Sequence, residues 1–157
     1  MEKPSFPVAV VMQRRLTSNR WQAQVWEPHG VLSGHVGGGE PEMLVDREGV
    51  QQWLHPGFTL RLYRDEAEGY YLNVSSGSPR VFVLWQMDGE RGVPLEVTVS
   101  YNEGGRWLDG GQSVDSVAMP QELFAWVGEY VEQNYRPEPR KRIKPRSFMH
   151  PKDRAAQ

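Results

Sequence analysis

The sequence contains no cysteine, which excludes disulfide bonds, thiolate nucleophiles, iron–sulfur ligation and cysteine-rich zinc sites. It also lacks any apolar stretch near the ~18 residues that a membrane-spanning helix requires. The apolar run at residues 8–12 is too short for the core of a secretory signal peptide. These absences predict a soluble, cytoplasmic protein with no membrane partner.

Catalytic and metal-binding motifs are missing as well. Four histidines are present, and none belongs to an HExxH helix or to another fixed ligand spacing. The glycines at 37–39 are followed by Glu40 and Glu42, whose charges would repel a phosphate group. The sequence therefore predicts no metal site, no cofactor and no catalytic residue, and we expect the protein not to be an enzyme.

The 157 residues are enough for one domain with a genuine hydrophobic core, and their charge is unevenly distributed. Residues 136–157 hold eight basic and two acidic side chains, which leaves ten basic and eighteen acidic side chains in residues 1–135. The first part therefore carries a net charge of −8 and the second +6. We predict a single β-rich domain over residues 1–135, followed by a basic, proline-rich flexible tail over residues 136–157.

Strand signals dominate the first two thirds of the chain, where short runs of β-branched and aromatic residues alternate with turn-forming residues. The expected strands are residues 8–14, 21–27, 58–63, 70–74, 80–87, 94–101 and 113–118. The second of these would place Trp21 on one face with Ala23 and Val25. Short connections after residue 58 predict an antiparallel meander, in which 80–87, apolar on both faces, is central.

Three further segments complete the expected fold. Residues 43–54 fit either a short helix or two short strands, and the glycine-rich residues 102–111 are assigned no element. Residues 120–135 are predicted to form an amphipathic helix with Pro120 at its start. The fold class is therefore mainly β (α+β): a small antiparallel barrel or a two-layer sandwich capped by one C-terminal helix. A pleckstrin-like arrangement also fits, by analogy alone.

Two charged segments are candidate binding sites. The basic residues of the tail are Arg140, Lys141, Arg142, Lys144 and Arg146. They would attract a polyanion or an acidic protein, although the −8 body opposes nucleic acid. Arg64, Asp65 and Glu66 belong to the densest charged run of the body, which we expect to be a solvated hairpin loop.

Three stretches resemble a known family. They are residues 10–15 (VVMQRR) with 19–22 (NRWQ), 26–28 (WEP) and 30–32 (GVL); residues 60–66 (LRLYRDE) with Tyr70 and Asn73; and residues 119–122 (MPQE) with 125–127 (AWV). The chain resembles an uncharacterised bacterial family, domain of unknown function three-three-zero-five, over nearly its whole length. Members of that family often lie in gene clusters with formate dehydrogenase and its maturation factors. The resemblance implies an accessory to a molybdenum or tungsten formate dehydrogenase, and it implies no catalytic residues.

The leading functional hypothesis is therefore a non-catalytic binding or assembly protein that engages a formate dehydrogenase subunit or maturation factor. One alternative is a small-molecule or cofactor-binding β-barrel, which could also be an enzyme. The other alternative is nucleic-acid binding through the basic tail, with binding that falls steeply as salt rises.

Overall fold

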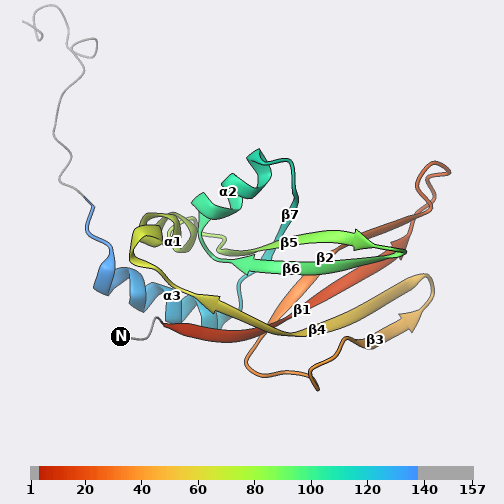
Figure 1. The fold of residues 1–157 in the computed structure, drawn as a ribbon, viewed down its shortest axis with the longest axis horizontal. Helices are drawn as coiled ribbons and strands as arrows, with labels where there is room; N and C mark the ends of the chain where they lie inside the picture. Colours follow the sequence, from red (N-terminus) through yellow and green to blue (C-terminus); the bar gives the residue numbers. More distant parts are fainter. Residues whose placement is uncertain (1–3, 138–157) are drawn as a thin grey trace, which may run out of the picture.

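A computed structural model describes residues 4–137, which form two antiparallel sheets and three α-helices (Figure 1). The first sheet has the order β2-β1-β4-β3, and the second has the order β6-β5-β7. The strands of the first sheet are β1 (Ser5–Leu16), β2 (Gln24–Ser33), β3 (Glu42–Arg47) and β4 (Val50–Arg61). Those of the second are β5 (Arg80–Asp88), β6 (Arg91–Thr98) and β7 (Ser113–Ala118). The predicted mainly β class with a C-terminal helix is confirmed, and the sheets do not close into a barrel.

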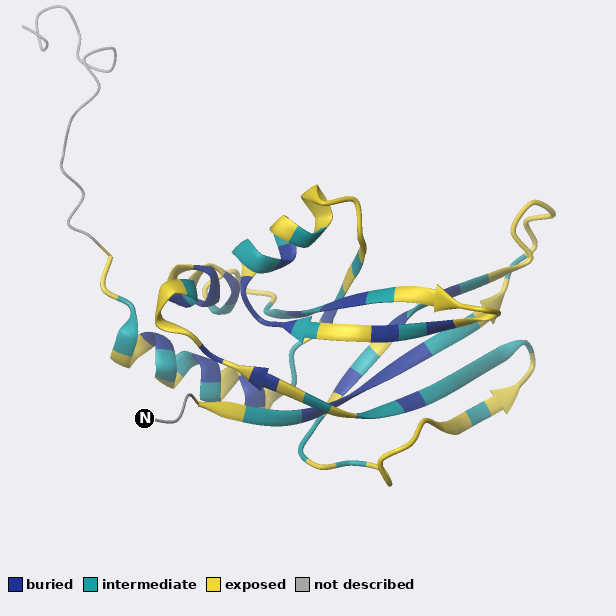
Figure 2. Cartoon of the chain, in the orientation of Figure 1, coloured by how far each residue is buried: buried dark blue, intermediate teal, exposed yellow. Residues whose placement is uncertain are grey.

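The hydrophobic core lies between the two sheets, where the inward faces of β1 and β5 meet. Val8, Val10 and Met12 of β1 pack with Val81 and Val83 of β5, and all five are almost fully buried. The buried positions concentrate in the middle of β1, whereas the hairpin turns are largely exposed (Figure 2). The central position predicted for residues 80–87 is confirmed, because β5 lies between β6 and β7.

The C-terminal helix α3 (Gln121–Asn134) closes one end of this core, as its amphipathic pattern predicts. It buries Leu123, Val127 and Val131 against the sheets. The ring centroids of Trp126 on α3 and Phe6 on β1 lie 5.2 Å apart, which fixes the helix against the start of β1. This packing removes the apolar stripe of α3 from water, and that burial is the main source of stability for so short a helix.

Residues 70–74 are not a strand as predicted, but the second half of helix α1 (Ala67–Val74). Tyr70 and Asn73 are buried three residues apart, while Tyr71 and Leu72 are about two-fifths exposed, and this spacing is helical rather than alternating. The helix lies beside α3, where the Tyr71 and Tyr135 rings stack with centroids 4.7 Å apart. Residues 58–101 therefore do not form the predicted meander.

A further helix, α2 (Tyr101–Asp109), forms in the glycine-rich segment and covers the outer face of the second sheet. Ser100 caps the helix, since its hydroxyl oxygen accepts a hydrogen bond of 3.1 Å from the Glu103 amide. Gly104 lies directly on the ring of Phe82, which points away from the core. A Cβ at this position would come within 2.9 Å of that ring, so the glycine permits the close approach of helix and sheet.

Gly104 and Gly105 are adjacent in α2, and replacing each of them with alanine gives a matched pair of predictions. We expect Gly104→Ala to lower the free energy of unfolding by about 1–3 kcal/mol, because the added methyl group overpacks against Phe82. Gly105→Ala meets no atom within 4 Å, and we expect it to raise that free energy by ~0.5–1 kcal/mol through helix propensity. Urea unfolding of both variants measures the difference, and equal effects would contradict the packing described here.

The second strand starts at Gln24 rather than at residue 21, so Trp21 lies in the loop between β1 and β2 instead of on a strand face. Residues 43–54 form two strands, not a helix; Glu48 and Gly49, both with positive φ, make the turn between them. The loop 17–23, the turn 48–49 and the turn 89–90 lie together at one end of the molecule, and α1 and α3 lie at the other (Figure 1). We call the end with these three turns the hairpin end.

Candidate functional site

Arg64, Asp65 and Glu66 do not lie in a solvated hairpin loop but form the short 3-10 helix η1 (Arg64–Glu66), which leads into α1. Glu66 is held at the junction of α1 and α2: its carboxylate accepts hydrogen bonds from the Ser100 hydroxyl (2.5 Å) and the Arg106 guanidinium (2.7 Å). Arg64 and Asp65 are exposed, and their side chains make no hydrogen bond within residues 4–137. Glu66 therefore joins two helices, and the structure does not bring the three predicted residues together as one site.

Asn73 joins α1 to the second sheet. Its side-chain NH₂ donates hydrogen bonds to the backbone oxygens of Arg80 (2.7 Å) and Val99 (2.8 Å), and its side-chain oxygen accepts one from the Arg80 amide (2.8 Å). The Tyr70 hydroxyl accepts a hydrogen bond from the Tyr63 amide, and burial raises the pKa of Tyr70 above its usual value. The stretch from residue 60 to Asn73, which carries part of the family resemblance, thus has a structural role.

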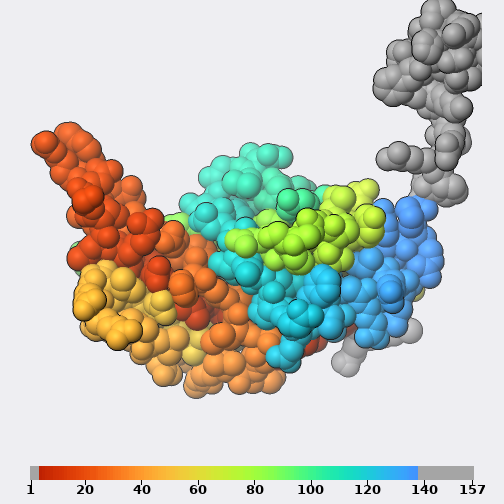
Figure 3. Space-filling view, turned by 180° about the vertical axis from the view of Figure 1, so that it is seen from behind, coloured from red at the N-terminus to blue at the C-terminus, as the bar shows by residue number. Residues whose placement is uncertain are grey.

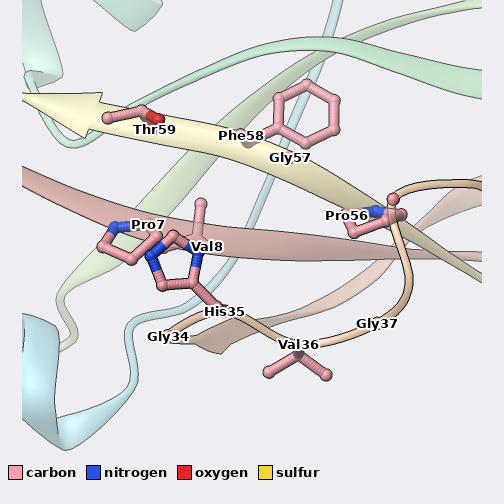
Figure 4. A pocket seen from close by; sticks show the side chains of 11 residues that line it. Pro7, Val8, Gly34, His35, Val36, Gly37, Pro56, Gly57, Phe58 and Thr59 are labelled. Carbon is pink, nitrogen blue, oxygen red and sulfur yellow. The ribbon is translucent and has the colours of Figure 1, made fainter.

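A cavity of about 250 Å³ lies beneath the glycine-rich loop after β2 (Figure 4). Its lining consists of Pro7, Val8, Gly34, His35, Val36, Gly37, Gly39, Pro56, Gly57, Phe58 and Thr59. The loop lies close to the sheet because Gly37, at φ 93°, has no Cβ; one would come within 2.9 Å of the Leu54 side chain. His35 is the single ionisable residue of this lining, so the cavity offers an apolar surface rather than a set of converging acids and bases.

Trp21 is the most exposed large hydrophobic residue of residues 4–137, with 87% of its surface accessible. The loop that carries it projects away from the body of the protein (Figure 3). This loop is internally hydrogen-bonded: the Thr17 amide donates to the Ala23 oxygen (2.9 Å), and the Trp21 amide donates to Oδ1 of Asn19 (2.8 Å). Trp21 is therefore presented on an ordered loop, with the Arg20 guanidinium 5.8 Å from its ring centroid.

The inner face of the sheet below this loop holds further arginine and tryptophan side chains. Arg14 of β1 is paired in register with Trp26 of β2. Nε of Arg14 and Nε1 of Trp26 are buried and have no hydrogen-bond acceptor within residues 4–137. The Arg91 guanidinium lies 4.4 Å from the ring centroid of Trp53. None of these residues is expected as a binding residue from the sequence, although an arginine inside an apolar alternating strand (Arg14 after Met12) is a signal for such a site.

His55, on β4, lies two residues beyond Trp53, and partial burial together with the charge of Arg91 lowers its pKa below 6.5. The unfolded chain therefore protonates His55 more readily than the folded protein does. The stability contributed by neutral His55 is lost as the pH falls from the ordinary histidine pKa of 6.5 towards the lower pKa of the folded protein. We expect the melting temperature of His55→Gln to fall less than that of the natural protein between about pH 7 and pH 5. Identical shifts in both proteins would contradict this assignment.

The tail residues Arg140, Lys141, Arg142, Lys144 and Arg146 lie outside the described residues. Within residues 4–137, no group of three or more His, Asp or Glu side chains could hold a metal ion. No helix in that part of the chain is long and apolar enough to cross a membrane.

Comparisons with known proteins agree with the sequence resemblance at the level of the family. Neither the search of curated proteins nor the search of solved structures found a match. The family described as "Protein of unknown function (DUF3305)" matches residues 7–144, which is most of the 157-residue chain. The chain therefore belongs to this family.

Proposed function

We propose that this protein is a non-catalytic binding or assembly protein that engages another protein. The observation that carries the proposal is Trp21, which stands 87% exposed on an internally hydrogen-bonded, projecting loop. Exposing an indole ring to water is unfavourable, whereas tryptophan and arginine dominate the residues that contribute most to protein–protein binding. A loop that is already ordered also loses little conformational entropy when a partner binds.

The proposed partner is a subunit or maturation factor of a molybdenum or tungsten formate dehydrogenase. Support for this choice comes from the resemblance described above, which implies an accessory to such an enzyme. Glu66 and Arg106 form an ion pair with each other. This pairing supports a structural role for the two residues and not a catalytic one.

Co-purification tests the proposal. The full-length protein, with its tail and an affinity tag, is expressed in its native host and purified at moderate salt, and the retained proteins are identified by mass spectrometry. We expect enrichment of a formate dehydrogenase component over a tag-only control. If no such component is retained, the proposed partner is wrong.

The cavity under the loop 34–39 favours a second candidate function, the binding of a small molecule. Its volume of about 250 Å³ is slightly below the ~300 Å³ at which ligand pockets usually begin, and its lining is mostly apolar. The space between the sheets is filled by core side chains, so a ligand would bind at this cavity and not inside a barrel. A rise in melting temperature with a pterin, a nucleotide or formate would support this function, and its loss in Gly37→Val, which places a side chain against Leu54, would locate the site.

A further inference from the structure

We propose that the hairpin end recognises an acidic, partly apolar segment of a partner protein, with Trp21 as the apolar anchor and Arg14, Arg20 and Arg91 as the cationic contacts. This inference rests on the proposed function in one respect only, namely that the ligand is a protein. We call Arg14, Arg20, Trp21 and Arg91 the arginine–tryptophan surface.

The charges around Trp21 support an acidic partner. Residues 14–23 contain three arginines and no acidic residue, although residues 1–135 carry a net charge of −8. Arg15 is paired with Glu27 at 2.8 Å, whereas Arg14, Arg20 and Arg91 have no carboxylate within 4 Å among residues 4–137. The other two turns of the hairpin end carry Glu48 and Glu90, so the positive charge is confined to residues 14–23 and Arg91. This local positive charge complements a short acidic segment and steers its approach.

The unpaired charge of Arg14, beside the buried indole of Trp26, is a second, independent observation. Trp26 is 7% exposed, and both its indole N–H and the Nε–H of Arg14 lack an acceptor within the described part of the chain. Buried polar groups are almost always hydrogen-bonded, and an unpaired cationic donor is the most costly exception. Arg14 as a whole is only half-buried, so a carboxylate from a partner beside its guanidinium would provide the negative charge that this part of the sheet lacks.

A protein segment fits this surface better than nucleic acid or an anionic membrane does. Single-stranded nucleic acid is usually held by several stacking rings along a continuous basic groove, whereas the projecting loop offers one exposed ring. Long-range repulsion between the acidic body and a polyphosphate opposes binding, and a membrane surface would meet the same repulsion. A short acidic segment needs only the local positive charge of the loop and of Arg14 and Arg91.

The experiment measures binding of the full-length protein to a fluorescein-labelled peptide in which Glu and Asp alternate with Leu and Phe, by fluorescence anisotropy. We expect saturable binding that weakens as salt rises, and no binding of the matched peptide with Lys in place of the acidic residues. Trp21→Ala and Arg20→Glu should each weaken binding by about tenfold or more. The controls are Leu108→Ala, which removes another exposed hydrophobic side chain, and Arg61→Glu, which reverses an exposed charge at the other end of β4. Both should bind the peptide as the natural protein does.

Arg14→Met separates a binding role from a structural one. If Arg14 serves a partner, removing its unpaired guanidinium should weaken peptide binding while leaving the melting temperature unchanged or higher. A lower melting temperature with unchanged binding would assign Arg14 to the fold and remove it from the surface.

Three results would overturn the proposal: no binding of the acidic peptide, equal binding by the loop variants and the natural protein, or loop-dependent binding of single-stranded DNA or of phosphatidylserine vesicles in place of the peptide. None of these depends on formate dehydrogenase. Failure of the co-purification with success of the peptide experiment would therefore reject the proposed partner and retain the surface.

Discussion

We expect Asn73→Ala to lower the free energy of unfolding by about 3–5 kcal/mol, a large part of the stability of a domain of this size. Asn73 is 1% exposed, and its amide makes three hydrogen bonds to the backbone of Arg80 and Val99. The substitution leaves two carbonyl oxygens and one amide without these partners and opens a small cavity. Chemical denaturation followed by circular dichroism measures the loss.

Asn73→Asp tests the same contacts, because it replaces the hydrogen-bond donor of the side chain with an acceptor and keeps its size. The side-chain oxygen that accepts from the Arg80 amide is kept, but the NH₂ that donates to two carbonyl oxygens is replaced by an oxygen that repels them. We expect a loss at least as large as for alanine near neutral pH, and a smaller loss in acid, where protonation of the introduced carboxyl restores one donor. Asn102→Ala, which removes one bond of 3.2 Å to Glu68, is the control and should cost no more than ~1 kcal/mol. Equal effects at Asn73 and Asn102 would refute the role assigned to Asn73.

Gly69→Ala should lower the free energy of unfolding by about 2–3 kcal/mol. A Cβ at this position in α1 would lie 2.3 Å from Oγ of Ser100 and 3.2 Å from the Asn102 amide. Ser100 cannot move aside without loss, because its hydroxyl also caps α2 and donates to Glu66. The added methyl group must therefore separate α1 from the start of α2.

The matched control for Gly69 is Gly128, an interior glycine of α3. A Cβ at Gly128 meets no atom within 4 Å, so Gly128→Ala should raise the free energy of unfolding by up to ~1 kcal/mol. Thermal and urea unfolding of both variants measure the contrast, and a stabilised Gly69→Ala would contradict the close contact between α1 and Ser100.

The regular parts of the fold could be predicted from the sequence because each has one clear period. The strand β5 was predicted almost to its ends, since residues 80–87 are apolar on both faces and lie between turn-forming residues. The helix α3 was predicted from its three-and-four spacing and from Pro120 at its start. In both segments local preference and tertiary packing agree.

The short helices α1 and α2 were missed because their stability comes from contacts that are distant in sequence. The aromatic residues around Tyr70 and Asn73 are typical of a strand. The helix is stabilised by the hydrogen bonds of Asn73 to the backbone of Arg80 and Val99, which the local sequence does not show. Gly104 disfavours a helix locally, yet the position against Phe82 admits no larger residue. Interactions of this kind override local propensity, and the sequence alone does not display them.

The candidate site was predicted less well than the fold. Alternation with Ala23 and Val25 predicts a strand face for Trp21, whereas the polar contacts of Thr17 and Asn19 extend the loop past Trp21. Glu66 is a candidate site residue on its charge alone, and its bond to Arg106, forty residues away, gives it a structural role. The resemblance to the family was confirmed, and the link to formate dehydrogenase stays a prediction.

Quantitative co-purification from the native host, with the natural protein compared with Trp21→Ala, tests the central claim most directly. We predict that the natural protein retains a formate dehydrogenase subunit or maturation factor and that Trp21→Ala, folded to the same melting temperature, retains about tenfold less. Equal retention by the two proteins would contradict the account of this chain as a binding protein that acts through its hairpin end, and no retention by either would contradict the proposed partner.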